Sequence, residues 1–442
     1  MPSLTSRLSR LAASSNPLPA PPRPDPPASL DQDPERRRRI ERLQAMIDAT
    51  ARRQVQRLQS QPKTEGSLEL PGRVESTSIG PLRKIRTELE PEHHHGRASV
   101  GRLLQSDRQS MARVVLHEGE LDPTRFVFLD TETTGLSTGA GTIPFLIGLG
   151  WFEEGRFVVE QLFLESLGDE QPMLTRVAEV LEGGDRTLVS FNGRVYDWPL
   201  LLTRGVLNRV ALPGAVAHLD LYHAARRIHA GHLERTRLQD LEISVMGFRR
   251  ERDIDGAEIP EAYWSYLRSR VTHKVHRILT HNLHDVVAMA ALFAKLADSF
   301  HTMDRREEPE AQLGRGRLAA RVGDHQRAFR FAVEAAEGGG DPACTHRAAV
   351  EAATAAQRLG RWSDAEKWWL VTLAEAEGEW ELAQVHLALA KLYEHRLRRP
   401  ASALRHAALS EPAEAPDANE RRIRRLERRL PKTAPGPILA CS

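Results

Sequence analysis

The sequence predicts a mixed-sheet α/β domain at about residues 119–298, followed by an all-α region of helical repeats. Three apolar strand-like segments lie close together, and then strands alternate with amphipathic helices. A later Ala-rich stretch repeats one short pattern. The chain has 442 residues, which is enough for about two or three domains.

The α/β domain begins with three apolar segments separated by short turns. "RFVFLD" (125–130) and "IPFLIGLGWF" (143–152) are the first two, and "RFVVEQLFLE" (156–165) follows the turn at Glu153–Gly155. Apolar strands at such close spacing are typical of an antiparallel meander. We therefore expect an antiparallel start to the sheet.

Strands and helices then alternate. "PMLTRVAEVLEG" is a predicted helix with Pro172 in its first turn and Gly183 at its end. "TLVSFN" is a strand, and a helix begins near Tyr196. A short strand and a helix follow within 215–229, and two more helices are expected at 237–248 and 277–297.

The C-terminal third contains a weak internal repeat. Gly323 to Ala328 recurs as Gly360 to Ala365, and Ala403 occupies the third equivalent position. Small residues recurring at intervals of about 34–40 residues are typical of helix-pair solenoids such as tetratricopeptide repeats. Trp362, Trp368 and Trp369 are expected to pack between these helices.

The N-terminal region carries little core-forming sequence. Residues 1–33 are rich in Pro, Ala and Ser and are expected to be disordered, whereas Ile40, Leu43 and Met46 predict a short basic helix. Residues 62–118 are predicted to be irregular. The expected divisions are a mostly disordered region at 1–75, a lead-in segment at 76–118, the α/β domain at 119–298, helical repeats at 305–410 and a basic tail at 411–442.

Composition favours a cytoplasmic protein. Cys344 and Cys441 are the only cysteines, too few for a disulfide framework. No apolar run reaches the length of about 18 residues that a transmembrane helix needs, so no membrane partner is expected. The net charge of +2 neither requires nor excludes a nucleic-acid partner.

Two carboxylates end the first strand. Asp130 and Glu132 are two residues apart, so on an extended chain both project to the same side. Gly135 then allows a sharp turn or a close approach by a ligand. Taken alone, the pair fits either solvated acids before a turn or two ligands of a divalent cation.

A second polar group follows the strand that contains "LVSFN". Asn192 ends this strand, and its amide can both donate and accept a hydrogen bond to anchor backbone or substrate. Asp197 stands in the first turn of the next helix. It either complements the helix dipole or supplies a third metal ligand.

A third group lies on the predicted helix that contains "THNLHDVVAMAALF". His281 and Asp285 are four residues apart and therefore share one helix face. The pKa of a histidine lies near working pH, so His281 can accept a proton from water. The alternative is a surface His–Asp pair.

Together these residues predict a metal-dependent nuclease centre. Four carboxylates can hold two Mg²⁺ or Mn²⁺ ions, because both cations prefer oxygen ligands. Such a pair activates a water and stabilises the leaving oxygen of a phosphodiester. The expected metal ligands are Asp130, Glu132, Asp197 and Asp285.

The motifs resemble those of a known nuclease superfamily. "FLDTETTGL", "FNGRVYDWPLL" and "HNLHD" are similar to the three exonuclease motifs of the DEDD superfamily within the ribonuclease H-like fold. The region "DLEISVMGFRRERDIDGAEIPEAYWSYL", with the helical repeats, resembles the bacterial YprB-like branch over about residues 75–410. The resemblance implies a ribonuclease H-like mixed sheet and a 3′–5′ exonuclease. It also implies that the four acids are metal ligands.

The chain departs from the superfamily pattern at His281. The third motif of these enzymes has either a tyrosine four residues before the last aspartate or a histidine five before it. Here the histidine stands at the tyrosine spacing, so its role as general base remains open. Catalysis is assigned to the four acids and His281. The expected substrate-binding residues are Thr133, Gly135, Leu136 and Asn192.

Several other residues fit a structural role or a contact with nucleic acid. Asp220 is expected to cap a helix, and Trp198 is expected to lie in the core rather than stack on a base. Arg249 and Arg250 fit either phosphate contacts or a solvated loop. Adjacent histidines cannot all reach one ion from an extended chain, so His93–His95 are expected to pack near the site rather than bind metal.

Two classes of function fit these residues. The first is a metal-dependent 3′–5′ exonuclease acting on DNA or RNA, whose repeats recruit a protein partner or the substrate. The second is a nucleic-acid-binding or scaffold protein with a weakly active or inactive domain. Four intact acids in order favour the first, whereas the unusual third motif keeps the second open.

Overall fold

The structure is a computed structural model that describes residues 69–135, 141–182, 185–214, 217–303 and 307–430. The predicted N-terminal disorder, the basic helix near Ile40 and Leu136 lie outside these residues. Among the helices described, none combines the length and apolar character needed to cross a membrane.

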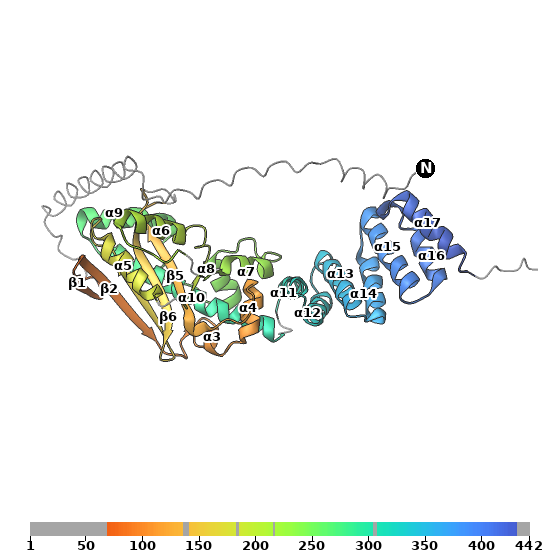
Figure 1. The fold of residues 1–442 in the computed structure, drawn as a ribbon, viewed down its shortest axis with the longest axis horizontal. Helices are drawn as coiled ribbons and strands as arrows, with labels where there is room; N and C mark the ends of the chain where they lie inside the picture. The colour runs from red at the N-terminus through yellow and green to blue at the C-terminus, as the bar shows by residue number, and fades with distance from the viewer. Residues whose placement is uncertain (1–68, 136–140, 183–184, 215–216, 304–306, 431–442) are drawn as a thin grey trace, which may run out of the picture. The chain divides into compact units, whose positions relative to one another are not determined.

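A seven-stranded mixed sheet organises the N-terminal part of the described chain (Figure 1). The strand order is β1-β2-β7-β6-β5-β8-β9, with antiparallel pairs up to β5 and parallel pairs from β5 to β9. The predicted meander is β5 (Phe126–Thr133), β6 (Pro144–Glu153) and β7 (Arg156–Phe163). The later predicted strands are β8 (Thr187–Ser190) and β9 (Ala217–Asp220). The mixed α/β fold class is therefore confirmed.

Helices cover both faces of this sheet, because the central strands are apolar on both sides. Phe126 and Phe128 of β5 belong to one core, which includes residues of α4 (Arg108–Val115), α7 (Leu221–His229) and α10 (His273–His301). Val127 and Leu129 point to the other face and share a second core with α5 (Glu170–Leu181), α6 (Asp197–Asn208) and α9 (Ile259–Ser269). The alternation of β5 thus joins the two layers.

The prediction that residues 62–118 are irregular is wrong for their described part. β1 (Arg73–Thr77) and β2 (Gly80–Leu89) extend the sheet, and β3 (His94–His95) pairs with β4 (Ala98–Ser99). The helices α3 (Arg102–Gln105) and α4 follow. Few residues of β1 and β2 are buried, so these strands lack the apolar run by which the other strands were recognised.

The helix predicted at 237–248 is shorter and less regular than expected. α8 (Leu238–Leu241) makes a single turn and continues as a π-helical turn, η2 (Glu242–Met246). Short 3₁₀ turns occur at Pro123–Arg125 and Gly256–Glu258. The π turn matters for the site because it positions Glu242, which is 1% exposed.

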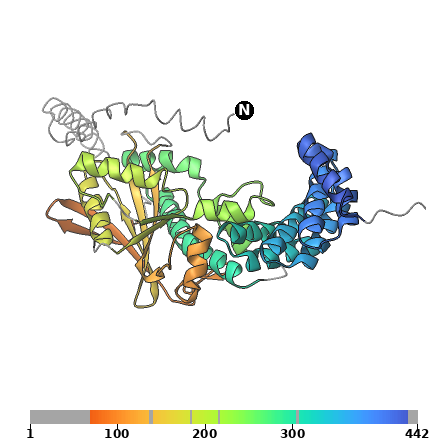
Figure 2. The ribbon, with the colours of Figure 1, turned by 45° about the vertical axis from the view of Figure 1, so that its right-hand side comes forward.

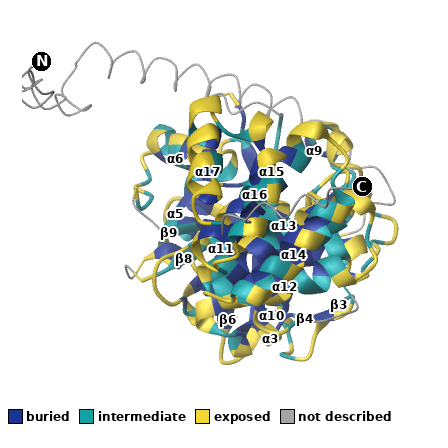
Figure 3. Cartoon of the chain, turned by 90° about the vertical axis from the view of Figure 1, so that its right-hand side faces the viewer, coloured by how far each residue is buried: buried dark blue, intermediate teal, exposed yellow. Residues whose placement is uncertain are grey.

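The C-terminal region consists of helices that pack in sequence (Figure 2). They are α11 (Pro309–Arg321), α12 (His325–Glu337), α13 (Pro342–Arg358), α14 (Trp362–Glu375), α15 (Glu379–His395), α16 (Pro400–Ala408) and α17 (Pro416–Glu427), with a 3₁₀ turn at Glu411–Ala413. Buried residues alternate with exposed ones around these helices (Figure 3). The repeated alanines Ala328, Ala365 and Ala403 are all buried, which confirms a helical region with small residues at its packing positions.

Two glycines of β6 allow α10 to lie close against the sheet. A Cβ at Gly148 would stand 2.4 Å from Asn282 Oδ1 and 2.9 Å from Val286 Cγ2. A Cβ at Gly150 would stand 2.5 Å from Val286 Cγ1. Both contacts are far shorter than van der Waals separation, so only glycine permits this approach. The approach brings the polar face of α10 to the end of β5.

We predict that Gly148→Ala destabilises the protein by about 1–3 kcal/mol, because the new methyl group must displace Asn282 and Val286. Gly168→Ala is the matched control, since a Cβ there meets nothing within 4 Å. Urea unfolding of both variants measures the difference. Equal stability of the two variants would contradict the close approach of α10.

Candidate active site

The first two predicted ligands leave the same side of β5. Phe126 and Phe128 face the core that contains α10, and Asp130 and Glu132 continue this alternation at the end of the strand. The register with β6 shifts between Glu132 and Thr133, which ends regular pairing. Both carboxylates therefore face α10, as the two-residue spacing predicted.

Asn282 of α10 holds the carboxylate of Asp130. Asn282 Nδ2 donates to Asp130 Oδ2 at 2.7 Å, and Asn282 Oδ1 accepts from Gln161 Nε2 at 2.8 Å. Gln161, on β7, also donates to the carbonyl of Leu279 at 2.8 Å. Asn282 and Gln161 are both buried, so this chain of hydrogen bonds fixes the orientation of the amide.

Asp197 reaches the site from the other layer. It is the first residue of α6, and Thr131 Oγ1 donates to its Oδ1. A Cβ at Gly193 would lie 2.8 Å from Asp197 Oδ2, so the glycine leaves room for the second oxygen. Thr131 lies between Asp130 and Glu132 in β5, and its hydrogen bond brings the third acid to the same strand end.

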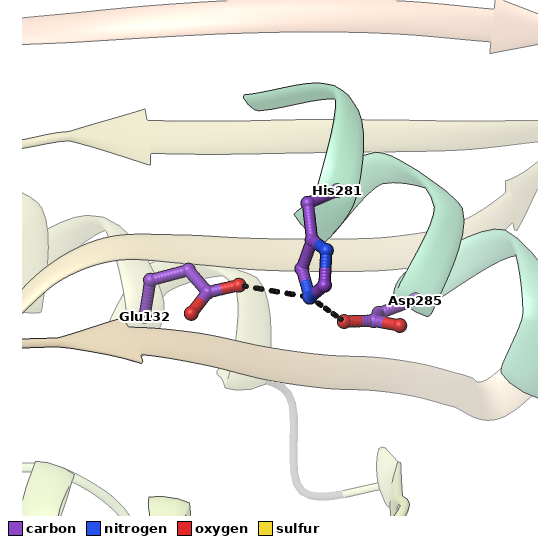
Figure 4. A group of neighbouring side chains, drawn as sticks. All are labelled: Glu132, His281 and Asp285. Atoms are coloured by element: carbon purple, nitrogen blue, oxygen red, sulfur yellow. Dashed lines mark ion pairs between the residues drawn. The ribbon is translucent and has the colours of Figure 1, made fainter. Parts of the chain in front are cut away.

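His281 and Asp285 lie on one face of α10, as their spacing predicted (Figure 4). His281 Nε2 is 3.3 Å from Asp285 Oδ2 and 3.9 Å from Glu132 Oε1. Nδ1 of the same ring is 2.9 Å from Asp253 Oδ1 and 3.0 Å from Asp253 Oδ2. The imidazole therefore stands between Glu132 and Asp285 on one side and Asp253 on the other.

A buried arginine, Arg250, is the main feature of the site that the sequence did not predict. Arg250 contacts the carboxylate of Asp285 and lies 3.3 Å from Asp253 Oδ2. It also contacts Glu242, at 2.7 Å from Nε and 3.0 Å from Nη2, and its Nη1 lies 3.4 Å from His281 Nδ1. The side chain of Arg250 is 5% exposed, so its interpretation as part of a solvated loop is wrong.

The histidine run contributes a support for this arginine. His95 Nε2 lies 2.7 Å from Glu242 Oε1, and its ring lies 3.8 Å from that of Phe248. His284 packs against the rings of His95 and Phe248. The expectation that the run packs near the site is confirmed for His95, which lies behind Arg250.

Burial and nearby negative charge raise the pKa values of three of the carboxylates. Burial raises the pKa of Asp130 well above its ordinary value, and the negative charges of Asp285 and Asp197 raise it further. Burial and the charges of Asp130, Asp285 and Asp197 do the same for the pKa of Glu132. Burial raises the pKa of Asp197 to about 6, although the Thr131 hydrogen bond opposes the rise. The site therefore favours uptake of positive charge.

The residues present fit a divalent cation. Glu132, His281 and Asp285 each offer a ligand atom within 4.8 Å of the others. Hydrogen bonds to one oxygen each of Asp130 and Asp197 leave the second oxygen of each group for a ligand. A set rich in carboxylate oxygens suits Mg²⁺ or Mn²⁺.

The other predicted site residues are less central. Thr133 Oγ1 donates to the carbonyl of Gly135 at 2.7 Å, so this hydroxyl shapes the turn after the acids. Asn192 has a φ of +67° at the end of β8, and its backbone N–H donates to Asp220 Oδ1 at 2.8 Å. Asp220 also caps α7, as predicted, by accepting from Tyr222 N at 3.1 Å. Trp198 is buried, which confirms its place in the core.

Sequence reasoning missed four polar residues of the site: Asn282, Gln161, Glu242 and Asp253. Asn282 directly follows His281 in the motif "HNLHD", and this position was the one feature of the sequence that could have identified it. The other three come from separate elements. Their contacts depend on tertiary packing, which local spacing does not encode.

Comparisons with known proteins agree with this geometry. Residues 127–297 match a sequence family described as the RNase_H superfamily, and all five predicted catalytic residues lie within the match. The uncharacterized protein YprB of Bacillus subtilis (strain 168) is 30% identical over 221 residues, which cover 49% of this chain and 52% of that protein. The chain thus spans about half the length of this curated relative. In this chain, a domain similar to the RNase H superfamily is followed by a helical region.

We predict that stabilisation by Mn²⁺ increases with pH between about 5 and 8. The pKa of Asp197 is raised to about 6, so the stability that this carboxyl contributes without metal is complete below about pH 4 and is lost as the pH rises through about 6. A metal ion binds only the ionised carboxylate. Below the pKa of a ligand carboxyl, metal affinity therefore falls about tenfold per pH unit for each proton that the metal must displace.

Melting temperatures with and without Mn²⁺ at about pH 5 and pH 8 measure this effect. We expect a difference of several degrees at the higher pH and little at the lower one. Asp130→Asn is expected to show no rise at either pH. An equal Mn²⁺ effect at both pH values, or one retained by Asp130→Asn, would contradict the assignment.

Proposed function

We propose that the protein is a metal-dependent 3′–5′ exonuclease that cleaves phosphodiester bonds of DNA or RNA. The observation that carries this proposal is the convergence of four acids from β5, α6 and α10, of which Glu132 and Asp285 also lie beside His281. The RNase H superfamily match supports a nuclease. The resemblance of the three motifs to DEDD exonucleases supports the 3′–5′ direction.

Asp130, Glu132, Asp197 and Asp285 would hold two Mg²⁺ or Mn²⁺ ions. When bound, such ions lower the pKa of an attacking water and neutralise charge on the scissile phosphate and the leaving oxygen. The chain's own task is to hold the acids in place. Asn282 holds one oxygen of Asp130, and Thr131 holds one oxygen of Asp197. These hydrogen bonds keep both carboxylates at the strand end.

His281 would serve as the general base. A burial penalty on Asp253 is outweighed by its hydrogen bond to His281 and by nearby positive charge, so the pKa of Asp253 is lowered and the group is ionised. Ionised Asp253 accepts the proton of Nδ1, which leaves Nε2 with a free lone pair toward Glu132 and Asp285. This arrangement supports proton removal from a water near the acids.

Arg250 would position the third motif. Its guanidinium joins Asp285 and Asp253, the two carboxylates on either side of His281. Burial lowers the pKa of Arg250, but the charges of Asp285 and Glu242 raise it above its ordinary value overall, so the group stays charged. Arg250 therefore restrains both carboxylates that contact the imidazole of His281.

The helical region suggests how the enzyme would reach a partner. We propose that α11–α16 form tetratricopeptide-like pairs that bind a protein or deliver the substrate. The small buried residues at Ala328, Ala365 and Ala403 support this assignment. The alternative function, a nucleic-acid-binding scaffold with an inactive domain, predicts that the acids are dispensable.

We expect stepwise shortening of a 5′-labelled single-stranded DNA or RNA from its 3′ end with Mn²⁺. Asp130→Asn and Asp285→Asn should each abolish cleavage, because each removes a charge from the metal site. Gel analysis with both polymers identifies the substrate. Wild-type cleavage that persists in both variants, or internal cuts without shortening from the end, would refute the exonuclease.

We expect Asp253→Asn to lower kcat by about 10–100-fold, as is typical when a group that orients a catalytic histidine is lost. Asp255→Asn is the matched control, because Asp255 only caps the nearby 3₁₀ turn. Asp253→Asn should also change the pH dependence of kcat, since an amide in place of the carboxylate no longer fixes which ring nitrogen of His281 carries the proton. Equal rates for both variants would show that Asp253 does not act on His281.

A further inference from the structure

A basic groove lies beside the carboxylate site. It has a volume of about 770 Å³ and is bounded by the end of β8, by α7 and by residues 233–238. Its charged lining residues are Arg226, Arg235, Arg237 and Glu234, so positive charge exceeds negative by two. All three arginines are exposed, and none forms an ion pair within the described part of the chain. Their guanidinium groups are therefore available to an anionic ligand.

The groove adjoins the cleavage site through two consecutive residues. Asn192 lines the groove, and Gly193 directly after it approaches Asp197 Oδ2. The positive φ of Asn192 turns the chain at this point, and Asp220 holds the turn by accepting from the N–H groups of Asn192 and Arg194 at 2.8 and 3.4 Å. A ligand that touches Asn192 in the groove would therefore lie next to Gly193, the residue that approaches Asp197 Oδ2.

Aromatic rings add a second recognition element. Phe191 and Tyr222 both line the groove, and their ring centroids lie 5.7 Å apart in an edge-to-face arrangement. Both rings are only partly buried. Aromatic faces beside arginines are the usual means of binding single-stranded nucleic acid without sequence preference, because every base can stack and every nucleotide carries a phosphate.

We propose that this groove binds the single-stranded segment of nucleic acid that precedes the nucleotide being removed. The inference rests on the proposed nuclease function and adds a substrate-binding surface to it. Arg226, Arg235 and Arg237 contact phosphates, and Tyr222 stacks on a base. The groove thus binds several nucleotides of the strand, while the 3′ end of the strand reaches Asp197.

Fluorescence anisotropy of 5′-labelled 12-nucleotide dT and U strands with the full chain in EDTA tests the groove without requiring cleavage. For the triple variant R226A/R235A/R237A, we expect weaker binding and a salt dependence of log K that is shallower by about 2, because each phosphate contact contributes about 0.7 on a single strand. Tyr222→Leu should lower affinity about tenfold without changing the salt dependence.

The matched control is R73A/R86A/R156A, which removes the same charge from exposed positions on β1, β2 and β7 at the opposite side of the sheet. It should bind as the wild type does, and melting temperatures confirm folding of each variant. Unchanged binding and salt dependence in the groove variant would overturn the inference, as would an equal loss in the control. If neither polymer is cleaved but the groove variant alone loses binding, the proposed exonuclease activity is refuted and the proposed binding groove is supported.

Discussion

Four carboxylates brought to one partly buried place are the constraint on which the site depends. Burial raises the pKa values of Asp130, Glu132 and Asp197, and the charges of neighbouring site carboxylates raise those of Asp130 and Glu132 further. Asn282 and Thr131 offset part of this cost through hydrogen bonds, and Arg250 supplies the nearest fixed positive charge. The remaining negative charge is what a divalent cation would neutralise, so stability, metal affinity and pH dependence are linked in one cluster.

The fold keeps this cluster together by joining both layers of the domain. β5 directs Asp130 and Glu132 toward α10, while Thr131 on the opposite side of the strand holds Asp197. The glycines of β6 let α10 approach closely enough for its polar face to reach these acids. Arg250 then links the third motif, through Glu242, to His95 near the start of the described chain. Residues far apart in the sequence are thereby held at one strand end.

Sequence patterns predicted the parts of the fold and site that depend on local spacing. The apolar runs identified β5, β6 and β7, and the two-residue and four-residue spacings placed each pair of predicted catalytic side chains on one face. β1 and β2 were missed because they are largely polar and bury few side chains. The burial of Arg250 also escaped prediction, since its partners Glu242 and Asp285 come from other elements and a charged run normally faces solvent.

The most direct test of this account is to locate bound metal in crystals grown with Mn²⁺, using anomalous scattering. We predict two ions at the end of β5, coordinated by Asp130, Glu132, Asp197 and Asp285, with His281 still held by Asp253. Asp130→Asn crystals grown in the same way should lose both ions. Manganese bound only elsewhere, or an occupied site that leaves these four carboxylates uncoordinated, would contradict the central claim that the acids converge to hold catalytic cations.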